Sequence, residues 1–123
     1  MTQHAESISA ITLVTADMAA SVAFYGVLDV EVVFGGSDSS FTTFKITEGQ
    51  FLNLQFDATW QKPAQVWGRL ILWVDDVDAM YDSFLSSRFT PSMAPSDAVW
   101  GERYFHILDP AGHEVSIARR LDA

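Results

Sequence analysis

Short apolar segments separated by turn residues recur along the chain, and this pattern predicts β-strands. Most residues in these segments are β-branched, aromatic or leucine, and Gly, Ser, Asp or Pro residues stand between them. The predicted strands are Ile8–Val14, Val30–Phe34, Phe41–Ile46, Phe51–Phe56 and Gly68–Val74, with a short edge strand at Phe89–Ala94. Alternate residues of a strand share a face, and in these strands one row is apolar while the other is mixed. The apolar row is therefore expected to pack under a helix.

Two segments show helical spacing instead, and each follows an aspartate. Asp17 is a good N-cap for the helix that begins at Met18, in which Ser21 is expected on the face opposite Tyr25. Asp76 opens a second and more regular helix. Its apolar stripe consists of Val77, Met80, Tyr81, Phe84 and Leu85.

The C-terminal part of the chain predicts a hairpin. The segments Tyr104–Leu108 and Val115–Ala118 are apolar, aromatic and β-branched, and the turn Asp109-Pro110-Ala111-Gly112 lies between them. With this hairpin, the order strand, helix and three strands occurs twice. We therefore expect a single α+β domain over residues 1–123, built of two tandem βαβββ modules at about 7–57 and 67–120. The irregular stretch 58–66 is the expected linker, and the mixed faces suggest one curved mixed sheet around a cavity.

Composition narrows the class of protein. The chain has 123 residues, no cysteine, and a net charge of −9 from 16 acidic and 7 basic side chains. Disulfide scaffolding and cysteine-ligated zinc are excluded, and a nucleic-acid partner is not expected of such an acidic chain. No apolar run is long enough to span a bilayer, and the polar N-terminus does not look like a signal peptide. A cytoplasmic protein without a membrane partner is expected.

Several short motifs occur in an order that resembles a known superfamily. They are Ile11-Thr12-Leu13-Val14, Asp17-Met18, Ser21-x-x-Phe24-Tyr25, Val74-Asp75-Asp76-Val77, Trp100-Gly101-Glu102-Arg103-Tyr104 and Asp109-Pro110-Ala111-Gly112-His113. Together they resemble the vicinal oxygen chelate superfamily, also called the glyoxalase/bleomycin resistance protein/dioxygenase superfamily. The resemblance implies two βαβββ modules and a homodimer. The segment Ala98-x-Trp100-Gly101-x-Arg103-Tyr104 is similar to the metal-free, antibiotic-binding branch.

The resemblance also implies four strand positions at which the superfamily's enzymes bind a divalent metal. In this sequence they are occupied by Ala10, Asn53, Arg69 and Ser116. Alanine cannot bind a metal and arginine repels it, so we expect no metal, no other cofactor and no catalytic residue. The histidines offer no replacement: His106 is expected to be structural or solvated, and His113, after the turn, to be solvated.

Aromatic residues on and near the mixed face suggest a binding cavity instead. The expected lining is Thr12, Phe51, Asn53, Arg69, Trp73 and Ser116, with Trp60 and Trp100 as stacking walls. Arg69 is expected to pair with an anionic group of a ligand or with Glu114. Trp67 is expected in the core or a dimer interface.

The predicted function is metal-independent binding and sequestration of a planar or cationic aromatic molecule, an antibiotic being one candidate. Two alternatives stay open. One is a metal-dependent lyase, isomerase or dioxygenase of the same superfamily with an atypical site, and the other is a dimer that binds no ligand.

Overall fold

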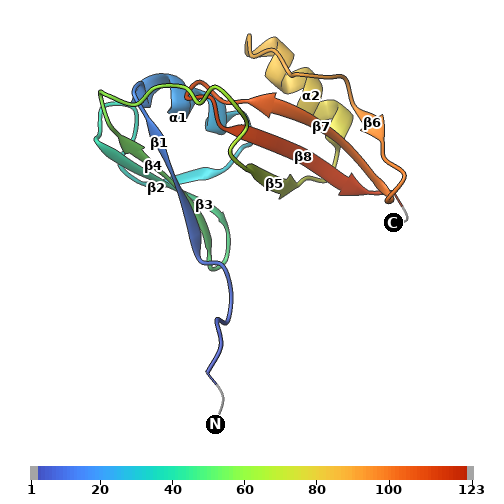
Figure 1. Cartoon of the computed structure of the whole chain (residues 1–123), viewed down its shortest axis with the longest axis horizontal. Coiled ribbons are helices and arrows are strands. Elements are labelled where there is room, and N and C mark those ends of the chain that lie inside the picture. Colours follow the sequence, from blue (N-terminus) through green and yellow to red (C-terminus); the bar gives the residue numbers. More distant parts are fainter. Residues whose placement is uncertain (1–2, 122–123) are drawn as a thin grey trace.

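A computed structural model describes residues 3–121. Its elements follow one another as β1 (Ala10–Thr15), α1 (Met18–Gly26), β2 (Glu31–Phe34), β3 (Phe41–Thr47), β4 (Gln50–Phe56), β5 (Arg69–Trp73), α2 (Val77–Ser86), β6 (Ser96–Asp97), β7 (Glu102–Leu108) and β8 (Glu114–Arg120). The strand–helix–three-strand order therefore occurs twice, as the sequence predicts. The fold is the expected α+β arrangement of two βαβββ modules (Figure 1).

Each module forms its own four-stranded mixed sheet. The first sheet has the order β1-β4-β3-β2 and the second the order β5-β8-β7-β6. In both, the first strand of the module is an edge strand that pairs in parallel with the last, and the remaining pairs are antiparallel. Strands β1 and β5 consequently each leave one backbone edge unpaired within their sheets.

The two helices begin where the sequence predicts. The side chain of Asp17 accepts a hydrogen bond from the backbone N–H of Ala20 at 3.0 Å, and Asp76 accepts one from Ala79 at 3.0 Å. Both helices lie on the same side of the two sheets, above them in Figure 1. No helix of the described part of the chain covers the opposite faces of the sheets, and we call these the open faces.

The core lies between the helices and the covered faces. It consists of Leu13, Met18, Phe24, Tyr25, Phe44, Leu52, Leu54, Val77, Phe84, Phe105, Ile107, Val115 and Ile117. The modules share it, since the ring of Phe24 from α1 lies 5.0 Å from that of Phe84 on α2. The Tyr25 hydroxyl also donates a hydrogen bond to the buried Asp109 carboxylate in the β7–β8 turn. Within one chain, therefore, the two modules pack against each other.

Three expectations about local structure are wrong. The short edge strand is Ser96–Asp97 rather than Phe89–Ala94, because Ser96 pairs with Tyr104 of β7. Ser21 is buried rather than turned away from the core, and its hydroxyl donates to the Thr15 hydroxyl at 2.7 Å. His113 is 4% exposed rather than solvated, because Trp60 and Trp67 from the 57–68 connection lie against its ring.

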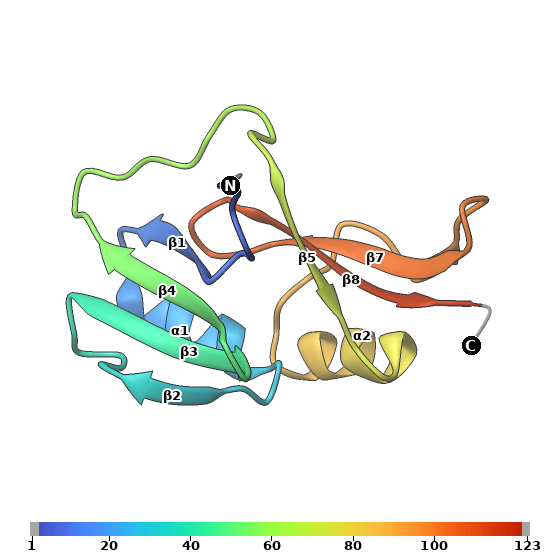
Figure 2. The same cartoon turned by 90° about the horizontal axis from the view of Figure 1, so that it is seen from below.

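The longest connection, residues 57–68, runs along one end of the molecule from β4 to β5 (Figure 2). Within residues 3–121, neither helix is long and apolar enough to cross a membrane.

Candidate functional site

A trough runs along the free edge of β5, between the two sheets. Its first part has a volume of about 420 Å³. The lining comes from three places: the segment Ile8–Ile11, the start of β4 at Gln50–Leu52 with Ile46 of β3, and β5 at Arg69–Leu72. Strand β5 is an edge strand of the second sheet, and in this lining its residues meet those of β1, β3 and β4 of the first sheet.

The trough continues towards the C-terminal end of β5. A second hollow of about 660 Å³ shares Ile46, Gln50, Ile71 and Leu72 with the first and reaches Trp73. Volumes of this size match cavities that hold small organic ligands. The trough thus brings together three of the predicted ligand residues, Phe51, Arg69 and Trp73.

Two more predicted ligand residues lie on the open face of the first sheet. The Asn53 side chain accepts a hydrogen bond from Thr43 at 2.7 Å and donates one to Thr12 at 3.2 Å. Thr12 and Asn53 are paired across β1 and β4, two residues along from Ala10 and Phe51. These hydrogen bonds form a polar row beside the trough.

The open face of the second sheet carries charged and aromatic side chains. Arg69 of β5 forms an ion pair through its Nε with Glu114 of β8, which is one of the two pairings that the sequence suggests for it. The guanidinium of Arg120 lies 5.7 Å from the centre of the Trp73 ring, within the range of a cation–π contact. Ser116 is placed on the same face but is only 4% exposed, because larger side chains surround it.

Strand β7 adds two residues that the sequence analysis does not place in the site. His106 is paired with Ser116 and Tyr104 with Ala118, so both face the same side as Trp73. Their rings lie 5.0 Å apart. The alternation of Tyr104, His106 and Leu108 with buried Phe105 and Ile107 is the signal that could have found them.

The pKa of His106 is lowered from its usual value. Burial of the ring is the first cause and the nearby Arg69 cation the second, while Glu114 acts in the opposite direction. At neutral pH the ring is therefore uncharged, and one of its nitrogens can accept a hydrogen bond.

The remaining tryptophans lie away from the trough. Trp60 donates its Nε1–H to the carbonyl of Ala111 at 2.9 Å and its ring lies against His113. Trp67 donates to Nδ1 of His113 at 2.9 Å. Trp100 is 66% exposed at the tip of the β6–β7 hairpin, where it donates to Glu102 and lies 5.8 Å from the Tyr104 ring. A ligand role for Trp60 and Trp100 stays a prediction.

The four positions at which the superfamily resemblance implies metal ligands do not suit a metal. Ala10 offers no donor, the Arg69 cation repels one, Ser116 is a weak neutral donor, and Asn53 already bonds its neighbours. Among the described residues, no group of three or more His, Cys, Asp or Glu side chains could hold an ion. The donor set therefore does not fit a divalent metal at this position.

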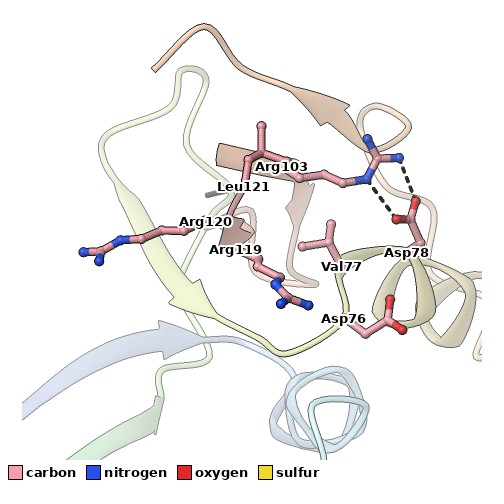
Figure 3. A pocket seen from close by; sticks show the side chains of 7 residues that line it. All are labelled: Asp76, Val77, Asp78, Arg103, Arg119, Arg120 and Leu121. Carbon is pink, nitrogen blue, oxygen red and sulfur yellow. Dashed lines mark hydrogen bonds and ion pairs between the residues drawn. The ribbon is translucent and has the colours of Figure 1, made fainter. Parts of the chain in front are cut away.

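A separate small hollow of about 240 Å³ lies at the start of α2, lined by the side chains labelled in Figure 3. Arg103 makes two hydrogen bonds of 2.9 Å to Asp78 and one of 2.8 Å to Asp97. Arg119 donates to the backbone carbonyl of Asp75. The charged groups that line the hollow thus form hydrogen bonds with neighbouring protein groups, and we interpret the hollow as a structural junction between α2, β6 and β7.

Comparisons with known proteins identify the family. The family model described as "Glyoxalase/Bleomycin resistance protein/Dioxygenase superfamily" matches residues 7–117. No curated protein matches the sequence.

Solved structures show the same fold at low identity. A glyoxalase/bleomycin resistance protein/dioxygenase from Nocardioides has a TM-score of 0.78 and 20% identity over 99% of this chain and 88% of its own. A bleomycin-binding protein complexed with bleomycin has a TM-score of 0.70 and 19% identity over 94% and 99% of the two chains. Lactoylglutathione lyase from Agrobacterium tumefaciens has a TM-score of 0.72 and 25% identity over 94% and 95%.

Proposed function

This chain belongs to the glyoxalase/bleomycin resistance protein/dioxygenase superfamily, and on that premise we propose that it binds and sequesters a planar aromatic small molecule without a metal. An antibiotic is one candidate, because a structural relative is a bleomycin-binding protein. The trough beside β5 is the proposed binding site. The observation that carries the proposal is this trough, whose size suits a small ligand. Within it, the Arg69 cation occupies a position that the superfamily resemblance gives to a metal ligand, which supports binding without a metal.

The side chains in the trough favour a flat ligand. Phe51 and Ile71 supply apolar walls, and Trp73 supplies a large ring that is 56% exposed. An aromatic ligand stacked on Trp73 gains roughly 0.5–1.5 kcal/mol beyond the burial of its apolar area.

We also propose that the chain acts as a homodimer. Several large apolar side chains are exposed along the trough and the open faces, among them Ile8 at 83% and Ile71 at 59%. Exposed apolar patches of this kind mark interaction surfaces. A second copy would cover them and deepen the trough.

Intrinsic tryptophan fluorescence tests the binding proposal. Titration with bleomycin and with a panel of planar aromatic compounds is expected to give saturable quenching that EDTA leaves unchanged. Trp73→Ala is expected to weaken the affinity about five- to tenfold, the loss of one ring contact. Trp67→Phe, next to His113 and outside the trough, serves as the matched control.

The same titration distinguishes metal-independent binding from the main alternative, a metal-dependent enzyme such as the lactoylglutathione lyase among the structural relatives. Quenching that appears only after Ni²⁺, Zn²⁺ or Mn²⁺ is added would contradict metal-independent binding. Unchanged affinity in Trp73→Ala would show that the ligand binds outside the trough.

A further inference from the structure

A single cation lines the first part of the trough, in otherwise uncharged surroundings. Most of the lining consists of isoleucine, leucine and phenylalanine side chains. Among the described residues, Ser9 and Gln50 are its uncharged polar members and Arg69 is its charged one. A guanidinium keeps its charge at every pH of interest, and a charge among apolar groups favours a partner of opposite sign. This part of the trough therefore favours a ligand with an anionic group.

The ion pair with Glu114 leaves most donors of Arg69 free. Within residues 3–121 the guanidinium forms one hydrogen bond, from Nε to the Glu114 carboxylate. The Arg69 side chain is 43% exposed, whereas that of Glu114 is 11% exposed. The two terminal amino groups of Arg69 form a planar fork that matches the two oxygens of a carboxylate. Arg69 can thus bind a second carboxylate without releasing Glu114.

The charges along the trough give a ligand one orientation. Asp29 and Asp75 line the second hollow, so an anionic group is repelled from that end. Arg69 and Trp73 stand at opposite ends of β5, four residues or about 13 Å apart. Ile71 lies between them on the same face. A ligand with its anionic group at Arg69 can therefore extend its rings over Ile71 towards Trp73.

Glu114 also favours a carboxylate over a phosphate as the anionic group. Its negative charge offsets that of Arg69, so the pair carries little net charge. A dianion is repelled by Glu114 twice as strongly as a monoanion. The site thus suits an anion of charge −1.

We propose that the ligand is an aromatic carboxylic acid, whose carboxylate binds the two terminal amino groups of Arg69 while its rings lie along β5 towards Trp73. The inference rests on the proposed binding function and names the chemical class of its ligand.

Calorimetric titration with four naphthalene compounds tests the inference. The probes are 2-naphthoate, the neutral 2-naphthalenemethanol, 2-naphthyl phosphate and the cationic 2-naphthylmethylammonium. We expect 2-naphthoate to bind about tenfold more tightly than the alcohol, because it gains charge-assisted hydrogen bonds to a half-exposed arginine. The phosphate and the ammonium are expected to bind more weakly than 2-naphthoate. High salt is expected to reduce the preference for 2-naphthoate over the alcohol, since it screens a half-exposed charge pair.

Two variants test whether this preference depends on Arg69. The double variant Arg69→Gln/Glu114→Gln removes the cation without leaving an unpaired carboxylate, so it is expected to bind 2-naphthoate and the alcohol equally. Glu114→Gln alone keeps an acceptor for Nε of Arg69 and removes the competing negative charge. It is therefore expected to bind 2-naphthoate about threefold more tightly than the unaltered protein does.

Arg88→Gln is the matched control, because Arg88 is exposed beyond the end of α2 and outside the trough. It is expected to keep the tenfold preference. Equal affinity for 2-naphthoate and the alcohol, tighter binding of the phosphate or the ammonium, or a preference that persists in the double variant would overturn the carboxylate assignment while leaving aromatic binding intact. Failure of all four probes and of every other planar aromatic compound to bind would overturn the proposed function as well.

Discussion

At the scale of single residues, Asp109 joins the two modules. Its carboxylate is buried and accepts hydrogen bonds from the backbone N–H groups of Ala111 and His113 and from the hydroxyl of Tyr25 on α1. The first two bonds shape the β7–β8 turn, and the third fixes that turn to the other module. Burial first, and then the Asp109 charge and the hydrogen bond to it, raise the pKa of Tyr25 above 10.0.

We predict that Tyr25→Phe lowers the free energy of unfolding by about 2 kcal/mol at neutral pH, because a buried acceptor loses a donor. The pH dependence has a definite sign. The raised pKa means that the stability is complete below about pH 10 and is lost as pH rises towards the folded pKa. Urea unfolding at neutral and alkaline pH measures both effects. Tyr81→Phe is the control, and an equal alkaline loss of stability in Tyr25→Phe would contradict the prediction.

The contacts of His113 give a second prediction at this scale. Nδ1 accepts from Trp67 at 2.9 Å, and Nε2 lies 2.8 Å from the carbonyl oxygen of Val14, so the neutral ring carries its proton on Nε2. Trp67→Phe removes one donor and is expected to cost about 1 kcal/mol in unfolding free energy. Trp100→Phe, whose partner Glu102 lies in an exposed pair, is expected to cost less than about 0.5 kcal/mol. Equal losses in the two variants would contradict this assignment.

At the scale of elements, the helix starts depend on local chemistry that the sequence shows directly. Asp76→Ala removes the bond to the Ala79 N–H and is expected to cost about 1 kcal/mol. Thermal unfolding followed by circular dichroism measures the change. Asp82→Ala, an exposed residue further along the same helix, is the control and is expected to leave the midpoint nearly unchanged. A similar fall in the midpoint for both variants would argue against a capping role.

The sequence predicts less well those features whose placement depends on residues in other elements. The positions of α1 and α2 follow from Asp17 and Asp76, whose bonds reach only three residues ahead. The placement of β6 depends on Tyr104, which lies across a hairpin, and the burial of Ser21 depends on Thr15 in the preceding strand. Propensity alone does not show such partners.

The same limit applies to the candidate site. Strand alternation correctly places Arg69 and Trp73 on a mixed face, and Phe51 on the corresponding face of the first sheet. It cannot show that β1 and β5 are the edges that leave a trough between separate sheets, because sheet order is a property of the folded chain. Nor can it show that Nδ1 of His106 is buried without a hydrogen-bond partner among residues 3–121, because that depends on every neighbour of the ring.

At the scale of the whole molecule, the exposed edge of β5 gives the last prediction. Ile71 is 59% exposed and lines both parts of the trough, so in a homodimer it is expected to lie against the second copy. Ile71→Glu places a charge there, and burying an unpaired charge is costly. We therefore expect the wild type to sediment as a dimer and Ile71→Glu as a folded monomer in analytical ultracentrifugation. Leu85→Glu, at an exposed position on α2, is expected to remain dimeric. A monomeric wild type would overturn the dimer and leave the trough of a single chain as the complete binding site.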